Sequence, residues 1–371
     1  MSWEEHIASY TRKIQENPND KTAYFNRGQT YFNLNQYESA IQDFSKLIEI
    51  DSDTGVYYYW RGNAYRNLGQ NELALVDYDK AIELNPNNSF YDVYKNRGMI
   101  YLALKKYEKS IQDLNEAIKL EIIPYYGDTY EQRGEAYLKS NQHEKAFKDF
   151  NKAIELCNKS ILNAMERNIA DYWAYNVRGF AYFYLGQYRL AIRDLNKVLE
   201  LCKNYPVAYN QRGLAHLQLK QYEKAIQDFN EAIKFDSEYE EAYKNRAEAY
   251  SKVFGQNETA IKDYDKLIKL NPNDSETYIK RGEAYLKLNL YKLAIEDFSK
   301  AIELNAEDAE TYLNRCIAYM SVEKYFEAIL DASKYIELKP DDAKGYYLRG
   351  KCCKNLAGED FGRAKEMGYE E

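Results

Sequence analysis

The sequence has few of the residues that build metal centres and catalytic sites. Its 371 residues include three histidines and five cysteines, and no CxxC pair is present, although Cys352 and Cys353 are adjacent. Scattered cysteines argue against a zinc site or a disulfide framework and favour a reducing compartment. The phosphate-binding GxxxxGK[ST], hydrolase GxSxG and zinc-peptidase HExxH motifs do not occur. We therefore expect no metal, no cofactor and no enzymatic activity.

The chain also has no excess of positive charge and no long apolar run. The chain has 51 Lys and Arg against 59 Asp and Glu, a net charge of −8, which disfavours nucleic acid because nucleic acid requires a basic surface. No apolar run approaches the roughly 20 residues that span a bilayer, so we expect no membrane insertion. Residues 1–5 lack the basic and apolar regions of a secretory signal. We expect a cytoplasmic protein, with a cytoskeletal or ciliary location as the alternative.

In place of these features the sequence has a repeated pattern of aromatic, small and charged residues. In its plainest copy, Tyr24, Gly28 and Tyr31 are followed by Ala40 and Phe44. An arginine stands before the small residue in each copy, and most copies lie 34 residues apart. A fixed period in this range predicts a solenoid of similar supersecondary units. The arginine and the small residue recur at Arg27-Gly28, Arg61-Gly62, Arg97-Gly98, Arg133-Gly134, Arg178-Gly179, Arg212-Gly213, Arg246-Ala247, Arg281-Gly282, Arg315-Cys316 and Arg349-Gly350.

Each unit predicts two helices. Apolar and small residues fall at helical spacing in two successive stretches, which indicates two amphipathic helices, A and B, joined by a short turn. A glycine inside a helix costs about 0.5–1 kcal/mol relative to alanine. Its return in most A helices therefore indicates close packing against the B helix, and Ala247 and Cys316 are small substitutes at the same position.

The second unit shows the full pattern at Tyr58, Gly62, Tyr65, Ala74, Tyr78, Ala81 and Pro86. These units resemble tetratricopeptide repeats, which are helix–turn–helix units of 34 residues. The resemblance covers nearly the whole chain and implies an all-α fold, an α-α superhelix in which helix pairs stack as a right-handed solenoid. It implies activity only as a class, because fold does not fix function.

We expect a single solenoid domain, because no linker or low-complexity segment interrupts the repeats. Solenoids need atypical units at their ends to cover the terminal repeats, and both ends supply such segments. We expect a cap helix in residues 1–20, nine repeats in 21–340, and a tenth A helix with a C-terminal cap in 341–371.

Two segments depart from the period. Eleven extra residues near 157–172 contain no proline or glycine and keep helical apolar spacing. They predict a B helix lengthened by about 16 Å, which perturbs the stacking; the alternative is that they project outward and leave the stacking regular. Near the other end, we expect Gly358 to end the tenth A helix and residues 360–366 to form a short closing helix.

A recurrent aspartate accompanies the recurrent arginine, from Asp43 in the first B helix to Asp331 in the ninth. A row of arginines could grip an acidic ligand; alternatively, an Arg–Asp ladder ties helices together within or between repeats. Because both residues recur in every unit whereas a binding site is local, we favour the ladder. For a similar reason His216, which stands where other repeats have tyrosine, favours a packing role.

The resemblance places the ligand surface on the concave face, which the A helices line. There Trp173, Phe180 and Phe183 fall on roughly one face of the fifth A helix, with acidic residues in the flanking repeats. An exposed apolar patch with a charged rim is typical of an interface. The alternative is that the lengthened helix around Ile161 and Met165 folds over these aromatics. We predict that the partner is bound by Trp173, Asn176, Phe180, Phe183, Tyr184, Asn210, Leu214, Leu217, Glu131, Glu135, Glu248 and Glu283.

These features together predict a non-enzymatic protein–protein interaction scaffold that binds a peptide or helix of a partner. The complementary ligand has apolar anchors and Lys or Arg flanks. The alternative is a permanent structural subunit of a large cytoskeletal, ciliary or organellar assembly. A third interpretation is a co-chaperone that binds chaperone tails. It is disfavoured because Lys95 is followed by Met99, and Lys244 by Glu248, where that subclass has Lys-x-x-x-Asn.

Overall fold

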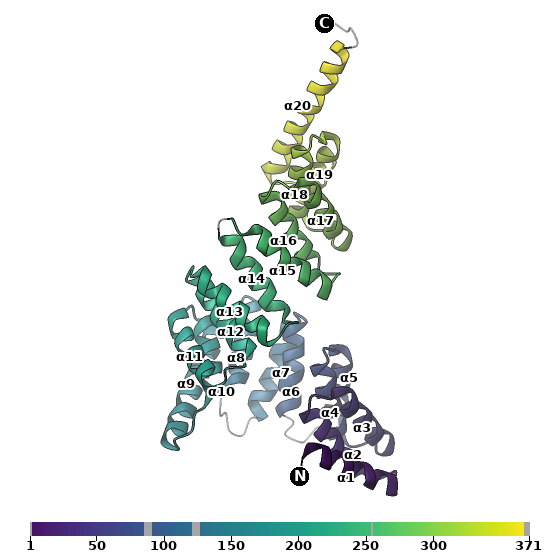
Figure 1. The fold of residues 1–371 in the computed structure, drawn as a ribbon, viewed down its shortest axis with the longest axis vertical. Helices are drawn as coiled ribbons and strands as arrows, with labels where there is room; N and C mark the ends of the chain where they lie inside the picture. Colours follow the sequence, from purple (N-terminus) through teal and green to yellow (C-terminus); the bar gives the residue numbers. More distant parts are fainter. Residues whose placement is uncertain (1, 85–90, 121–126, 254, 367–371) are drawn as a thin grey trace. The chain divides into compact units, whose positions relative to one another are not determined.

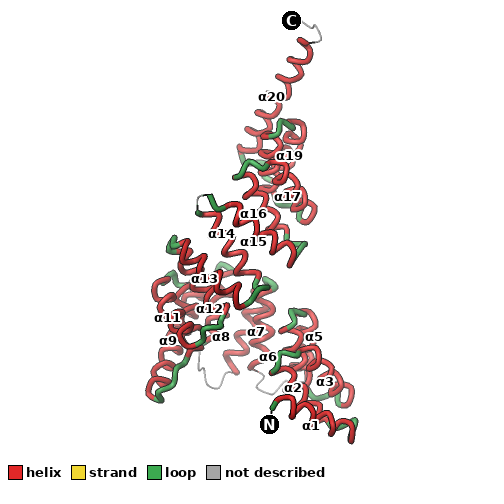
Figure 2. The backbone as a smooth tube through the Cα atoms, viewed as in Figure 1, coloured by secondary structure: helices red, strands yellow, loops and turns green. Residues whose placement is uncertain are grey.

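The computed structural model consists of helices joined by short turns (Figure 1). It describes residues 2–84, 91–120, 127–253 and 255–366. Within these residues there is no β-strand, as Figure 2 shows. The chain divides into two compact units, residues 1–194 and 195–371, which are described separately. The expected all-α solenoid of helix–turn–helix units is confirmed for the described residues.

The first unit begins with a single helix, after which A and B helices alternate. The first helix has a capping box, in which Ser2 and Glu5 each accept a hydrogen bond from the other's backbone N–H. The Asp20 and Asp171 side chains cap two A helices by accepting from backbone N–H groups at 3.0 Å. The bounds are α1 Trp3–Glu16, α2 Lys21–Asn33, α3 Tyr37–Ile50, α4 Gly55–Asn67, α5 Asn71–Leu84, α6 Tyr91–Ala103, α7 Tyr107–Leu120, α8 Asp128–Lys139, α9 His143–Glu166 and α10 Tyr172–Tyr184.

Helix α11, Tyr188–Leu201, crosses the boundary between the units. The second unit continues the alternation and ends on a long A-type helix. The bounds are α12 Pro206–Gln218, α13 Tyr222–Phe235, α14 Glu240–Lys252, α15 Asn257–Leu270, α16 Ser275–Lys287, α17 Tyr291–Leu304, α18 Ala309–Ser321, α19 Tyr325–Leu338 and α20 Ala343–Glu366.

In most repeats the small residue of the A helix makes room for a ring of the B helix. A Cβ atom built on Gly28 would lie 2.9 Å from the Phe44 ring, and one on Gly213 would lie 2.6 Å from the Phe229 ring. These separations are shorter than van der Waals contact, so a larger residue requires the ring to move. The rings themselves are fully buried and form the centre of each repeat. The buried rings include Phe44, Tyr78, Phe150, Phe229 and Phe298.

The predicted Arg–Asp ladder holds the two helices of each repeat together. In the first repeat, Arg27 donates to the Asp43 carboxylate from Nε at 2.9 Å and from Nη2 at 2.6 Å. Its Nη1 donates to Thr11 of the preceding helix at 3.0 Å. The ladder therefore acts both within and between repeats. The further pairs are Arg61–Asp77, Arg97–Asp113, Arg133–Asp149, Arg178–Asp194, Arg212–Asp228, Arg246–Asp263, Arg281–Asp297 and Arg315–Asp331.

The bond from Nη1 shows how each repeat docks on the one before it. In a regular junction, it reaches the residue two positions after the aspartate of the preceding B helix. These acceptors are Ser45, Asp79, Asn115, Asn196, Asn230, Asp265 and Ser299.

The junction between α9 and α10 differs from the regular ones. Arg178 Nη1 donates at 2.6 Å to Asn158, although the regular position is Asn151, whose amide instead bonds the Phe147 carbonyl of its own helix. Asn158 lies seven residues further along, a shift of about 10 Å. Helix α9 has 24 residues, where regular B helices such as α3 have 14. The next repeat therefore docks on the lengthened part of α9.

Ring packing shows the same shift. The Phe44 ring stacks on Trp60, two residues before the small residue of the next A helix, with centroids 6.2 Å apart. The equivalent Phe150 ring stacks on Tyr184, five residues after the small residue, with centroids 5.0 Å apart. The offset is again seven residues. Helix α9 then ends at Glu166, so its last turn extends past the contact with α10.

The C-terminal part differs from the expectation. Helix α20 runs without interruption to Glu366, so the expected break at Gly358 is absent and residues 360–366 belong to the same helix. All but one of the other A helices are followed by a turn with one residue of positive φ, such as Asn35 and Gly69, seven positions after the small residue; after Ala247 this residue is Gly255, eight positions on. The corresponding residue after Gly350 is Ala357. Alanine is the strongest helix former and is disfavoured at positive φ, so the helix continues.

Candidate functional site

The predicted binding residues lie on the surface that the A helices form, which we call the A-helix face. In the first unit, α10 supplies the predicted aromatic residues, and all four are partly buried. The Tyr184 ring lies against Phe150, and the Phe183 ring contacts Tyr184 and Tyr188 at centroid distances of 5.7 and 5.5 Å. The aromatics of α10 therefore divide between core packing and the surface. Phe180 directly follows the small residue of α10 and is also partly exposed.

The lengthened helix α9 covers only part of this aromatic group. Trp173 packs against the core cluster that contains Cys157 and Ile161 of α9. Met165, by contrast, is 67% exposed and does not cover the aromatics. Asn176 is buried, and its side-chain oxygen has no hydrogen-bond partner within the described residues.

The acidic part of the first unit's A-helix face lies on α8. Glu131 is 9% exposed, and its side chain makes no hydrogen bond or ion pair with any described residue. Burial raises its pKa well above the ordinary value, and the carboxylates of Glu135 and Asp128 raise it further. Lys95 counteracts this rise in pKa, but it is itself bound to Asp128 at 2.5 Å. Lys139 acts in the same way on Glu135.

Glu135 is partly buried, and it links two A helices. Burial raises the pKa of its carboxyl, while a hydrogen bond with the Tyr184 side chain lowers it. This bond joins α8 to the C-terminal end of α10, the end that the seven-residue shift brings beside α8. Sequence spacing placed Glu135 and Tyr184 in neighbouring repeats but gave no indication that they touch.

In the second unit, two predicted residues serve mainly to pack A helices together. Asn210 is buried, and its Oδ1 accepts a hydrogen bond from the Asn245 amide at 2.9 Å. Leu217 is buried against Phe229. Leu214 packs against the same cluster and stays partly exposed, so it is the residue of the three that offers apolar surface.

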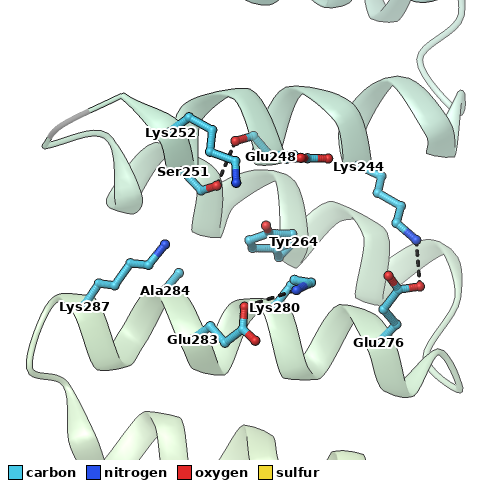
Figure 3. Close-up of a pocket in the computed structure, with 10 residues that line it drawn as sticks. All are labelled: Lys244, Glu248, Ser251, Lys252, Tyr264, Glu276, Lys280, Glu283, Ala284 and Lys287. Atoms are coloured by element: carbon cyan, nitrogen blue, oxygen red, sulfur yellow. Dashed lines mark hydrogen bonds and ion pairs between the residues drawn. The ribbon is translucent and has the colours of Figure 1, made fainter. Parts of the chain in front are cut away.

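The predicted residues Glu248 and Glu283 come together at a pocket of about 270 Å³ between α14 and α16. Figure 3 shows Tyr264 of α15 between the two helices, with charged side chains on both sides. Burial raises the pKa of Tyr264, and the carboxylates of Glu283 and Glu248 raise it further.

Charge pairing in this pocket is incomplete. Lys244 binds Glu276 at 2.7 Å and Lys280 binds Glu283 at 3.2 Å (Figure 3). The remaining lining charges, one carboxylate and two ammonium groups, have no ion pair within the described residues. These unpaired groups are Glu248, Lys252 and Lys287.

Sequence reasoning missed the lysines of this pocket, although a signal was present. Lys252 and Lys287 each stand five residues after the small residue of their A helix. Equal positions in consecutive A helices fall side by side in a solenoid, so two lysines at the same position predict a shared cationic edge. In Figure 3 both side chains lie at the same end of the pocket.

The described residues contain neither a metal-binding cluster nor a membrane-spanning helix. No group of three or more His, Cys, Asp and Glu residues is arranged to hold a metal in the described part of the chain. No described helix has the length and apolar character needed to cross a membrane. His216 is buried, and its Nδ1 lies 2.8 Å from Gln221 Oε1, which agrees with the packing role expected for it.

Comparison with known protein families agrees with the fold. Models described as tetratricopeptide repeat match the chain in six segments, and a model described as TPR repeat matches it in two. No curated protein is significantly similar to the chain. The matched residues are 22–53, 56–88, 91–121, 127–160, 206–239 and 275–308 for the former, and 179–220 and 255–289 for the latter.

Three solved structures match the chain at low identity, and the first of them shows the same fold. The chain resembles the APC/C hetero-tetramer Cut9–Hcn1 with 16% identity and a TM-score of 0.56, over 90% of this chain and 76% of that one. YrrB, described as a TPR protein with an unusual peptide-binding site, matches with 21% identity and a TM-score of 0.47, over 53% of this chain and 100% of that one.

A third solved structure, a tetratricopeptide repeat protein from Parabacteroides merdae ATCC 43184, matches with 20% identity and a TM-score of 0.46. The match covers 71% of this chain and 98% of that one. At such identities the likeness concerns the fold alone. The family models, the 34-residue period and the recurring helix pairs together show that this chain belongs to the tetratricopeptide repeat family.

Proposed function

We propose that this chain is a non-enzymatic scaffold whose A-helix face binds a peptide or helix of another protein. The proposal is carried by one contrast within the molecule. The recurrent arginines and aspartates of the repeats are paired with each other, from Arg27–Asp43 to Arg315–Asp331. On the A-helix face, however, the side chains of Glu131, Glu248 and Lys252 form no ion pair with any described residue. Charges without internal partners on one face give a binding partner a complementary pattern to recognise.

The chemistry of the face indicates what the partner segment contains. Phe180 and Phe183 supply partly exposed apolar surface in the first unit, which suits apolar anchors on the ligand. The buried carboxylate of Glu131 calls for a cationic side chain. In the second unit, Lys252 and Lys287 call for an acidic one. The face of the first unit therefore fits apolar anchors with a basic residue, and the pocket of the second unit fits an acidic residue.

The proposal is tested by capturing the partner with the tagged full-length chain, identifying it by mass spectrometry, and measuring its dissociation constant for variants. We expect Phe180→Ala combined with Phe183→Ala to lose at least about 2 kcal/mol of binding free energy, as burial of hot-spot aromatics requires. Circular dichroism must show that the double variant keeps its fold.

The matched control removes apolar surface of similar exposure elsewhere. Leu73 and Val76 are 49% and 65% exposed on helix α5, a B helix, and their double alanine variant should bind the partner normally. The proposal fails if the α10 variant binds as the wild type does, or if both variants lose affinity equally. A partner that does not exchange from the purified complex would instead indicate a permanent structural subunit.

A further inference from the structure

Helix α20 is the A helix of a tenth repeat, and the described residues contain no B helix to pair with it. Its residues Arg349 and Gly350 occupy the positions that pair with a B helix in the nine preceding repeats. Because α20 continues as one helix to Glu366, no B helix folds back against this side within the described residues. The surface formed by Tyr346, Arg349, Gly350 and Cys353 is called the open α20 face below.

The open α20 face is exposed where the equivalent surfaces are covered. Tyr346 is 48% exposed, whereas the tyrosines at the same position in other repeats include Tyr58 at 9% and Tyr312 at 8%. A Cβ atom built on Gly350 meets nothing within 4 Å, whereas one on Gly282 would lie 2.7 Å from the Phe298 ring. The space that a B-helix ring fills elsewhere is therefore empty at Gly350.

The arginine of this face lacks its usual partner. Its guanidinium lies over the Tyr346 ring, 5.6 Å from the centroid, as Arg27 lies over Tyr24 at 5.6 Å. Arg27 also binds an aspartate, but Arg349 has no hydrogen bond or ion pair with any described residue. The cation is thus held in position and free to bind an acid.

The repeats themselves show which helix covers such a face. Each B helix presents an aspartate to the arginine and, at the next residue, a side chain that fills the space at the small residue, most often a ring. An alanine three residues before the aspartate lets the two helices approach. Helix α17 shows this arrangement with Ala294, Asp297 and Phe298, all buried against α16.

We propose that the open α20 face binds an amphipathic helix of another protein that carries the sequence Ala-x-x-Asp-aromatic. The partner's aspartate binds Arg349 through Nε and Nη2, its ring enters the space at Gly350, and its alanine allows close approach. The partner thereby completes a tenth repeat. This site is independent of the A-helix face, and either proposal can fail without the other.

A second copy of this chain fits the face less well. Its helix α1 is the one unpaired B-type helix at the other end of the described residues. Thr11 of α1 accepts the arginine that docks there, which places Ser9 at the aspartate position and His6 at the alanine position. A serine gives no charge to Arg349, and a histidine is too large for close approach, so a separate partner is favoured.

The probe for this site is a fluorescent peptide with the sequence of α17, residues 291–304, cross-linked on its solvent face because short isolated helices are marginal in water. Its affinity for the full-length chain is measured by fluorescence anisotropy. We expect saturable binding that weakens at least tenfold when the peptide's Asp297 is replaced by alanine. Bound peptide should also slow alkylation of the exposed thiol of Cys353, which lies on the same face.

Variants of α20 separate binding from folding. Gly350→Leu fills the empty space and adds a better helix former, so it should keep or raise the melting temperature while abolishing peptide binding. Arg349→Ala should weaken binding at least tenfold, and Lys351→Ala, which removes a neighbouring exposed cation, should leave it unchanged.

Three results would overturn the proposal. The first is no saturable binding of the α17 peptide to the wild-type chain. The second is equal binding by the wild type and Gly350→Leu. The third is self-association in sedimentation experiments that Gly350→Leu abolishes while the peptide does not bind, because the occupant would then be α1 of a second copy.

Discussion

At the scale of single residues, each repeat is held by a small set of interlocking contacts. Arginine pairs with aspartate in bidentate geometry, and a glycine or another small residue accepts the neighbouring ring. The aspartates are nearly inaccessible, as Asp194 at 1% shows, so removal of one partner leaves a buried charge unpaired. The recurrence of both residues in the sequence was enough to predict this pairing, because a structural role repeats with the fold and a binding role does not.

The contribution of one such pair can be measured at Asp194. Replacing this residue with alanine leaves the Arg178 guanidinium, whose side chain is 12% exposed, without its carboxylate. Loss of one member of a buried pair costs about 3–5 kcal/mol, so the melting temperature should fall clearly. Glu200→Ala is the control, because Glu200 is 63% exposed and pairs only with Lys197. Equal melting temperatures for the two variants would refute the role of the ladder in stability.

The buried carboxylate of Glu131 gives a pH-dependent prediction. Its pKa in the folded chain lies above the unfolded value because of burial and of Glu135 and Asp128. The ionised form therefore destabilises the fold, and this cost grows as pH rises through the folded pKa. Glu131→Gln should raise the melting temperature at pH 8 by about 2–4 °C, which corresponds to roughly 1 kcal/mol. The gain should vanish near pH 4, where both side chains are neutral.

The contrary result for Glu131 is equally clear. A variant that is less stable than the wild type at pH 8, or a gain that is the same at pH 4 and pH 8, would mean that the carboxylate is already neutralised in the fold. Glu155→Gln serves as the exposed comparison, because this carboxylate lies on the surface with its pKa lowered to about 2 by Lys159 and Lys152.

At the scale of helices, the sequence predicted the pairs and their packing but not every junction. The period and the small residues identified the A and B helices, because each repeat meets the same geometric demand. The docking of α10 on α9 could not be predicted in the same way. Eleven inserted residues amount to about three turns, yet α10 is displaced by seven residues, since Cys157 and Ile161 offer it a new apolar contact.

The sequence also failed at two features that depend on tertiary contact. Gly358 was expected to end α20, but an exposed glycine inside a helix costs only about 1 kcal/mol, and no turn residue stands at Ala357. The pocket lysines Lys252 and Lys287 lay outside the predicted set, because at their position, five residues after the small one, only the aromatic Tyr184 was selected. Their shared position could have been noticed in the sequence.

The displaced junction has a direct test in two asparagines of α9. Asn158 accepts a charge-assisted hydrogen bond from Arg178 at 2.6 Å, whereas Asn151 only bonds its own helix. Asn158→Ala should therefore destabilise the chain by about 1 kcal/mol more than Asn151→Ala, allowing for partial exposure. Chemical denaturation measures this difference in unfolding free energy, provided that the two variants unfold with equal m-values. If α10 docked on α9 as in the regular junctions, Asn151→Ala would instead be the more destabilising of the two variants.

At the scale of the whole chain, the repeats contain two sets of residues with different roles. One set recurs in every unit and holds helices together; the other varies between units and carries the charges and rings that have no internal partner. Because each repeat contacts mainly its neighbours, the variable residues can change without loss of the fold. We therefore expect function to depend on the residues that break the repeat.

The most direct test of this account is hydroxyl-radical footprinting of the full-length chain with and without its captured partner. The account predicts protection of side chains on the A-helix face, with Phe180, Phe183 and Leu214 among the strongest, and unchanged reactivity at Leu73 and Phe326 on the B helices. Protection confined to the B helices, with the A-helix face as reactive as in the free chain, would contradict it.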